Sequence, residues 1–142
     1  EIILAGRKVN DGMGNYVASE VIKLMIQKGI SIVDSEILVL GITFKENCPD
    51  VRNTKVVDVV NSLQEYGIKI TIYDPWAREE EVQNEYGLAS TQKIPTQKFD
   101  AIVLTVAHHQ FKNLDFESLK KEDAVIYDVK NVLSASIKDK SL

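Results

Sequence analysis

Apolar residues recur along the chain at two spacings, and each spacing predicts a different kind of element. Between Asp11 and Lys28 they follow the helical period, which predicts one long helix. Asn10 or Asp11 is expected to cap its start, and Gly29 is expected to end it. The sequence therefore predicts that a long helix is the first element of the chain.

From residue 37 onward, short apolar runs alternate with helical patterns. Val56, Val59 and Leu63 keep the helical period although valine favours strands, and Gly67 ends this helix. Two further short helices are expected in "AREEEVQNEYG" and in "NLDFESLKK", where Asn113 or Asp115 is the expected cap. The expected strands are Ile37–Gly41, Ile68–Pro75, Asp100–Val106 and Ala124–Val129.

Strands that alternate with helices indicate βαβ units with right-handed crossovers and a mainly parallel sheet. We therefore predict an α/β fold, a Rossmann-like three-layer sandwich that a long helix precedes. The helix and the α/β part are expected to meet near Ser31–Ser35.

Composition and charge exclude several classes of protein. The 142 residues are 44% hydrophobic and 27% charged, which is typical of one globular domain. No membrane span or signal peptide is recognisable, and the net charge of −4 argues against a nucleic-acid binder. One cysteine excludes an internal disulfide and favours the cytoplasm. Because the chain starts at Glu1 and not at methionine, we expect it to be part of a longer protein.

Candidate binding residues follow the expected strands, because ligands bind at the carboxyl ends of strands in open α/β sheets. Lys45, Arg52 and Lys130 follow two of these strands and are expected to converge on a diphosphate. A helix that begins near Asn53 would add its positive N-terminus. Asp50 is expected to hold Arg52 or to cap that helix. The alternative, that these cations are solvated loop charges, remains open on spacing alone.

Other chemistry is less well supported by the sequence. No G-x-G-x-x-G occurs, so an NAD site within this chain is not expected. Cys48 has no local base to activate it and is interpreted as incidental. His108 and His109 are adjacent and lack a third ligand, so no metal site is expected, and a loop packed by Phe111 is preferred.

Five segments resemble one family in their order along the chain. They are "GRKVNDGMGNYVA", "LGITFKENCPDVRNTKVVDVV", "YDPWA", "AIVLTVAHHQF" and "YDVKNVL". In this they resemble UDP-glucose/GDP-mannose dehydrogenases, and "ENCPDVRN" is most similar to the branch that oxidises UDP-N-acetylhexosamines for Vi-type surface polysaccharides. The resemblance covers essentially the whole chain.

The resemblance implies a C-terminal UDP-binding domain of an enzyme that oxidises C6 of a UDP-sugar to a carboxylate and reduces two NAD. In the family, an N-terminal Rossmann domain binds NAD, and a cysteine in a separate Gly-rich motif forms a thiohemiacetal. Cys48 lies outside that motif. The resemblance therefore implies that this chain alone carries no catalytic residue.

The resemblance also assigns substrate contacts. It implies UDP-sugar binding by Phe44, Lys45, Arg52, Lys130, Arg7 and Asn10. Many members carry arginine at the position of Lys130, so a two-pronged phosphate contact is not expected there. Arg7 and Asn10 match the motif on the central helix, near the substrate and the dimer interface of the family.

The same resemblance divides the chain into residues 1–30, the end of a central dimerisation helix, and residues 31–142, the UDP-sugar-binding domain. The expected partners are the UDP-sugar, the N-terminal domain and a second copy of the protein. Two alternatives stay open. One is a flavodoxin-like or receiver-like partner-binding module, although Lys45 replaces the acidic cluster of a receiver. The other is an assembly platform formed by the long helix.

Overall fold

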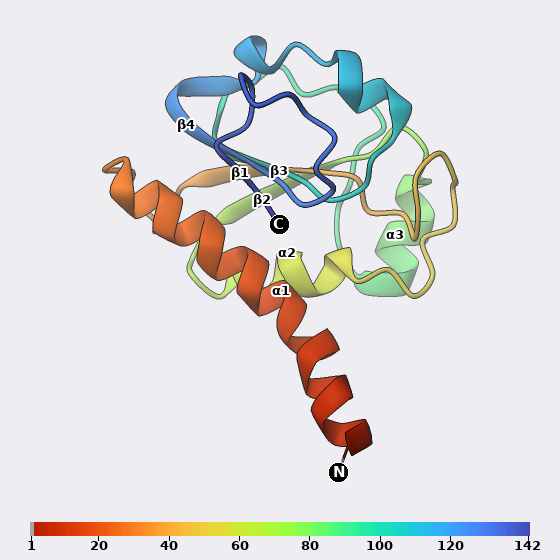
Figure 1. Cartoon of the computed structure of the whole chain (residues 1–142). Coiled ribbons are helices and arrows are strands. Elements are labelled where there is room, and N and C mark those ends of the chain that lie inside the picture. Colours follow the sequence, from red (N-terminus) through yellow and green to blue (C-terminus); the bar gives the residue numbers. More distant parts are fainter. Residues whose placement is uncertain (1) are drawn as a thin grey trace.

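Five parallel strands form a sheet in the order β2-β1-β3-β4-β5 (Figure 1). The computed structural model describes the backbone of residues 2–142 and the side chains of residues 12–142. The parallel sheet that the sequence predicts is thus confirmed. The strands are β1 (Glu36–Leu40), β2 (Lys69–Tyr73), β3 (Phe99–Leu104), β4 (Lys120–Asp128) and β5 (Lys140–Ser141). The sequence did not indicate β5, because two residues are too few to show a period.

The strand β1 is buried on both faces, as its continuous apolar run predicts. Ile37 and Val39 pack with the helices, whereas Leu38 and Leu40 pack with the turns on the other face. The sheet therefore has a layer on each side, and the three-layer prediction is confirmed. The outer layers are α1 (Ile2–Gln27), α2 (Val56–Gln64) and α3 (Glu79–Tyr86) on one face, and the 3-10 turns η1 (His109–Asn113) and η2 (Phe116–Ser118) on the other.

The strand order reverses direction between β1 and β3. From β1 the chain crosses through α2 to β2 on one side, then returns through α3 to β3 on the other side of β1. Such a reversal leaves a crevice at the carboxyl ends of the two strands, because their loops leave in opposite directions. The segments at this crevice are residues 41–55 and 105–108.

Two sequence expectations about helices need correction. The long helix begins at Ile2, so the backbone of Asn10 and Asp11 lies inside it and neither residue caps its start. The expected helix in "NLDFESLKK" is replaced by η1 and η2, because buried Phe111 and Phe116 hold the segment against the sheet and β4 already begins at Lys120. Among residues 2–142, no helix combines the length and apolarity needed to cross a membrane.

The start of α2 also differs from the expectation. Asn53 adopts a left-handed backbone with φ of 56°, so it cannot belong to the helix. The helix begins at Val56 instead, whose N–H donates to Thr54 Oγ1 over 3.2 Å. Asp50 therefore does not cap α2. Because α2 begins at Val56, the loop after β1 is longer than the sequence indicated.

The helices α1 and α2 lie side by side on one face of the sheet and touch at Gly14 (Figure 1). A Cβ atom at Gly14 would lie 2.6 Å from Cβ and 2.7 Å from the carbonyl carbon of Asp58. Only a glycine permits this distance between the two helix backbones. Gly12 lies two residues before Gly14, and a Cβ atom there would have no atom within 4 Å.

We predict opposite effects for alanine at these two glycines. Gly14→Ala should lower the free energy of unfolding by about 1–3 kcal/mol, because α1 must move away from α2. Gly12→Ala should raise it by about 0.5–1 kcal/mol through better helix propensity alone. Urea unfolding of both variants checks this. A Gly14→Ala chain as stable as the unchanged chain would contradict the close helix contact.

Candidate functional site

A cavity of 320 Å³ lies at the carboxyl ends of the strands, below the crevice between β1 and β3. Thr43 and Phe44 line it from the loop after β1, Thr105 from the end of β3, and Lys130 from the end of β4. The remaining lining comes from α1 and from the start of α2: Met13, Gly14, Val17, Asn53, Thr54, Lys55, Val56, Asp58 and Val59, with Val106, Val129 and Leu142. The lining thus combines apolar side chains with polar and charged ones.

The structure brings together two of the residues that the sequence singles out. Phe44 and Lys130 line the cavity, whereas Lys45 and Arg52 are not among its lining residues. Lys55, which the sequence reasoning missed, adds a second cation to the lining. The sequence feature that could have identified Lys55 is its position directly before α2, where a cation lies next to a helix N-terminus. The side chains of Arg7 and Asn10 lie outside the described residues.

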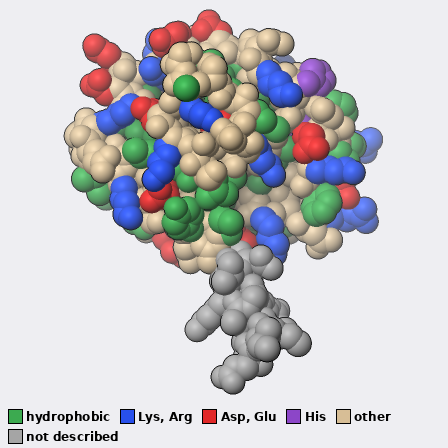
Figure 2. Space-filling view, in the orientation of Figure 1, with side chains coloured by type: hydrophobic (Ala, Val, Ile, Leu, Met, Phe, Trp, Pro, Cys, Tyr) green, Lys and Arg blue, Asp and Glu red, His purple; other side chains and the backbone are tan. Residues whose placement is uncertain are grey.

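A second hollow of 550 Å³ lies between α1 and α2, lined in part by Asn15, Tyr16 and Tyr66. It is larger but shallower, and it lies away from the strand ends. We place the candidate site at the strand ends, because that is where parallel sheets bind ligands and where the predicted cation Lys130 lies. On the face in Figure 2, Lys and Arg side chains are scattered among acidic and apolar groups, which suits a local anion pocket better than a polyanion surface.

At the start of the loop after β1, the backbone packs closely against the end of β3. Gly41 has φ of 99°, and a Cβ there would lie 2.5 Å from Cβ of Val106. Thr105 at the end of β3 donates its hydroxyl to the carbonyl oxygens of Leu40 (2.9 Å) and Gly41 (2.7 Å). Gly41 is therefore needed to fit β1 against the end of β3 and does not form a dinucleotide turn.

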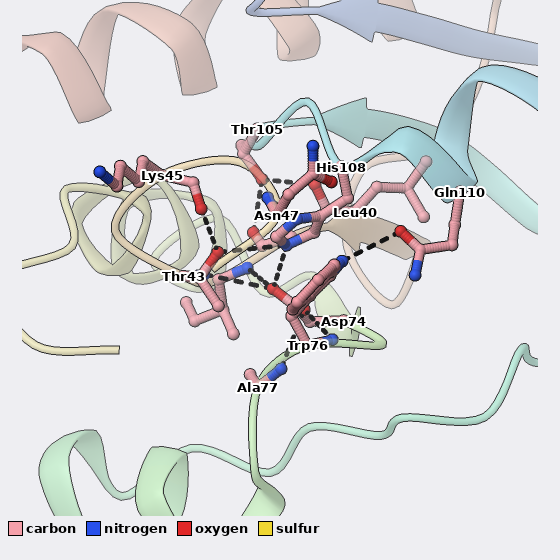
Figure 3. Close-up of polar contacts among 12 residues, drawn as sticks. Leu40, Thr43, Lys45, Asn47, Asp74, Trp76, Ala77, Thr105, His108 and Gln110 are labelled. Atoms are coloured by element: carbon pink, nitrogen blue, oxygen red, sulfur yellow. Dashed lines mark hydrogen bonds and ion pairs between the residues drawn. The ribbon is translucent and has the colours of Figure 1, made fainter. Parts of the chain in front are cut away.

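A buried carboxylate, Asp74, joins the ends of three strands (Figure 3). It follows β2 and is fully shielded from solvent. Because its donors come from three different strand ends, one side chain fixes the relative positions of these ends. Its Oδ2 accepts from the N–H of Ile42 (2.7 Å) and Thr43 (3.2 Å) and from Nε2 of His108 (3.0 Å); its Oδ1 accepts from the N–H of Trp76 (2.7 Å) and Ala77 (3.1 Å).

Two opposing effects set the pKa of Asp74. Burial favours the neutral acid and by itself would raise the pKa. Hydrogen bonds from His108, from the N–H of Ile42 and from the N–H of Trp76 favour the carboxylate more strongly, so the pKa of Asp74 lies below its usual value. The group is therefore an anion at neutral pH and accepts from every donor around it.

Arg52 is held by Asp50 through a two-pronged contact, as one of the sequence alternatives predicts. Its Nε lies 3.1 Å from Oδ1 and its Nη2 lies 3.3 Å from Oδ2. The hydrogen bond from Arg52 lowers the pKa of the Asp50 carboxyl, and the same contact raises the pKa of Arg52. Glu81 and Glu85 of α3 line the same small hollow. The guanidinium thus lies in an acidic setting beside α3.

Two short hydrogen bonds to backbone carbonyls hold the rest of the loop. The N–H of Phe44 donates to the carbonyl of Asp50 over 2.7 Å, and the hydroxyl of Tyr86 donates to the carbonyl of Val51 over 2.5 Å. The side chain of Phe44 is 58% exposed, and Lys45 is exposed beside it. Figure 3 shows the Lys45 side chain directed away from the Asp74 network. The backbone is fixed, while these two side chains are available to a ligand.

The remaining candidates have mostly structural roles. His108 is fully buried and contacts Asp74, whereas His109 is exposed. Phe111 is buried, as the preferred interpretation of this loop expected. Cys48 is half-buried in the loop. Among the described residues, no group of three or more His, Cys, Asp or Glu side chains is arranged to hold a metal ion.

We predict that Asp74→Asn lowers the free energy of unfolding at neutral pH and makes this free energy depend less on pH in the acid range. At pH 7 the free energy of unfolding should fall by about 2–4 kcal/mol, because a buried acceptor shared by several donors is lost. The lowered pKa stabilises the fold above the unfolded-state value of about 3.9, and this contribution is lost as the pH falls through the folded-state pKa.

Urea unfolding between pH 3 and pH 7 checks the Asp74 prediction. Asp115→Asn changes an exposed carboxyl and serves as the matched control, with an expected change of less than about 0.5 kcal/mol. An Asp74→Asn chain that follows the unchanged chain at every pH would show that this carboxylate does not hold the strand ends together.

Comparisons with known proteins show the family of this chain. Residues 38–135 match the UDP-glucose/GDP-mannose dehydrogenase family, UDP binding domain. UDP-N-acetyl-D-glucosamine 6-dehydrogenase of Salmonella typhi is 49% identical over 98% of this chain and 33% of its own length. Protein CapL of Staphylococcus aureus is 36% identical over 95% of this chain and 32% of its own length.

The fold agrees as well. The crystal structure of NDP-N-acetyl-D-galactosaminuronic acid dehydrogenase from Methanosarcina mazei Go1 matches 94% of this chain and 28% of that chain, with a TM-score of 0.82 and 24% identity. The chain spans about a third of the length of the curated relatives it matches. The chain belongs to the UDP-glucose/GDP-mannose dehydrogenase family.

Proposed function

We propose that this chain is the C-terminal UDP-binding domain of a nucleotide-sugar 6-dehydrogenase. The intact enzyme would oxidise a UDP-N-acetylhexosamine, or a UDP-hexose, to the uronic acid with two NAD. The name of the Salmonella typhi relative, UDP-N-acetyl-D-glucosamine 6-dehydrogenase, supports this substrate class. A role in surface polysaccharide synthesis is part of the proposal. The single cysteine is compatible with a cytoplasmic enzyme.

The loop after β1 is the observation that carries this proposal. It lies within the segment that matches the UDP-binding domain of the family, and it presents exposed Phe44 and Lys45 from a backbone fixed at Asp74. A fixed backbone lowers the entropy that binding must otherwise cost. Phe44 offers a ring face to a base or sugar, and Lys45 offers a charge to a phosphate.

The cavity supports a partial UDP site. Its 320 Å³ is at the small end of ligand pockets, which run from about 300 to 1,000 Å³. Lys55 and Lys130 give it positive charge, and the N-terminus of α2 adds a partial one. We infer that it takes part of the UDP-sugar and that the rest of the enzyme encloses the remainder.

The loop after β1 is not a dinucleotide-binding turn. The turn after β1 presents Ile42, Thr43 and Phe44 where a dinucleotide site needs glycines for close approach to the pyrophosphate. Within the proposed enzyme, NAD serves as the hydride acceptor and is bound by another domain. The contribution of this chain is to bind and orient the UDP-sugar.

We also propose that the enzyme is a homodimer through α1. Tyr16 of α1 and Tyr66 after α2 are 50% and 42% exposed and line the 550 Å³ hollow between the two helices. Exposed aromatic side chains along a hollow are typical of protein interfaces. The alternative of a flavodoxin-like partner-binding module has support only from the strand order, which indicates a fold and not a function.

The dimer proposal predicts that Tyr16→Glu produces a monomer, because a charge would be buried at the interface. Light scattering on the intact enzyme checks this, with Lys112→Ala on η1, on the other face of the sheet, as the surface control. A wild-type monomer, or a Tyr16→Glu dimer, would contradict it.

The UDP-site proposal predicts that Lys45→Ala and Lys130→Ala each weaken UDP binding by about 10- to 100-fold, because a hydrogen bond to a charged group contributes about 1.5–3 kcal/mol. Arg52→Ala should weaken it by about tenfold, because it removes the Asp50 contact that holds the end of the loop. Isothermal calorimetry of the intact enzyme with UDP measures this.

Lys69→Ala is the matched control, since Lys69 is an exposed lysine at the start of β2 and thus at the other end of the strands from the cavity. Its UDP affinity should equal that of the wild type. Unchanged affinity in the Lys45 and Arg52 variants would overturn the assignment of these residues to the site.

A further inference from the structure

His108 is a fully buried histidine that contacts the ends of two other strands (Figure 3). Its Nε2 lies 3.0 Å from Oδ2 of Asp74 and 3.1 Å from Oγ1 of Thr43. Its Nδ1 lies 2.9 Å from the backbone nitrogen of Asn47. The ring therefore joins the end of β3 to the end of β2 and to the middle of the loop after β1.

These contacts determine which ring nitrogen carries the proton. The backbone N–H of Asn47 can only donate, so Nδ1 must accept and carries no hydrogen. Thr43 uses its hydroxyl hydrogen toward the carbonyl of Lys45 over 3.0 Å, so its oxygen accepts from the ring. Nε2–H is then the donor, shared between Thr43 and the Asp74 carboxylate. In this arrangement the ring is a neutral imidazole in a single tautomer.

The Asn47 turn is the part of the loop that His108 holds. Asn47 has φ of 55°, a left-handed conformation that asparagine adopts more readily than most residues other than glycine. Its side-chain oxygen accepts from the N–H of His109 over 2.9 Å, and its own N–H donates to His108. The turn is thus fastened to the β3 loop from both its side chain and its backbone.

The His108 ring is enclosed by side chains and backbone from three segments. Asp74 comes from the end of β2, and Thr43 and Asn47 come from the loop after β1. Trp76 stacks on the ring with centroids 6.0 Å apart, and Phe111 of η1 meets it edge-on at 5.4 Å. Of these groups, Asp74 carries a charge. A second proton on the ring would place a hydrogen at Nδ1, directly against the N–H of Asn47.

We propose that His108 is a positioning residue for the UDP-sugar site: its Nδ1 accepts from the Asn47 turn and thereby fixes the backbone that presents Phe44 and Lys45. This inference rests on the proposed function and extends it to a residue that does not line the cavity. The Asp74 carboxylate fixes the tautomer, and the tautomer fixes the turn. A ring with a proton on Nδ1 cannot hold the loop.

Two substitutions separate this role from simple packing. His108→Asn keeps a carbonyl oxygen at the position of Nδ1 and can still accept from Asn47. His108→Gln keeps an amide at the position of Nε2 and can still donate to Asp74, but it offers no acceptor to Asn47. Lys112→Ala, on the same connection and exposed, is the control.

Calorimetry of the intact enzyme with UDP-N-acetylglucosamine measures the effect, and this probe has no phosphate group that titrates near neutral pH. His108→Asn should bind within about threefold of the wild type, and His108→Gln about tenfold more weakly, as for one lost hydrogen bond. Hydrogen exchange of the peptide that covers residues 43–50 should be faster in His108→Gln alone. Equal affinities in the two variants, or equal exchange, would overturn the proposal.

The backbone amide of Asn47 covers the case in which His108→Gln does not fold. In the wild type and in His108→Asn its hydrogen exchange should be slow, because this N–H donates to the side chain at position 108. An Asn47 amide that exchanges as fast as an unpaired loop amide in both proteins would overturn the proposal. A wild type that binds neither UDP nor the UDP-sugar would contradict the proposed function instead, and the exchange comparison would still decide whether His108 holds the loop.

Discussion

The carboxylate of Asp74 is the constraint on which the rest of the site depends. Three parallel strands end beside it, and each end leaves backbone N–H groups that the sheet no longer pairs. Asp74 accepts from those of the β1 loop and of its own turn, and from His108 at the end of β3. Because the donors favour the anion more than burial disfavours it, the group stays charged inside the protein. One side chain thus sets the relative positions of three loops.

The consequence is a loop whose backbone is formed before any ligand arrives. It is held at its start by Asp74, in its middle by His108, and at its end by the Asp50–Arg52 pair and the Tyr86 hydroxyl. In a Rossmann dinucleotide site, glycines serve this purpose by letting the backbone approach the phosphates. Here side chains take over the task, which leaves room for a longer loop with an aromatic ring and a cation at its tip.

Much of the fold could be predicted from the sequence, because the period of apolar residues reports directly on burial. The run Ile37–Gly41 indicated a strand buried on both faces, and the spacing from Val56 indicated a helix against the propensity of valine. The segment between β3 and β4 could not be predicted, since Asn113 and Asp115 offered helix caps, whereas the buried Phe111 and Phe116 hold the segment against the sheet as 3-10 turns.

Candidate residues at the strand ends could also be predicted, but their pairing could not. Asp74 and His108 each follow a strand, yet 34 positions separate them, and only the strand order places them together across the end of β1. Lys55 was missed because the actual start of α2 depends on the left-handed backbone of Asn53. Local patterns report on burial; contacts between distant strand ends depend on topology.

The most direct test of this account is a pair of crystal structures of the intact protein, without and with UDP. We predict the same backbone for residues 41–53 in both, with the diphosphate between Lys45 and Lys130 and a ring of the ligand against Phe44. A loop that rearranges on binding, or a UDP molecule seated in the hollow between α1 and α2, would contradict the claim that Asp74 preforms the site.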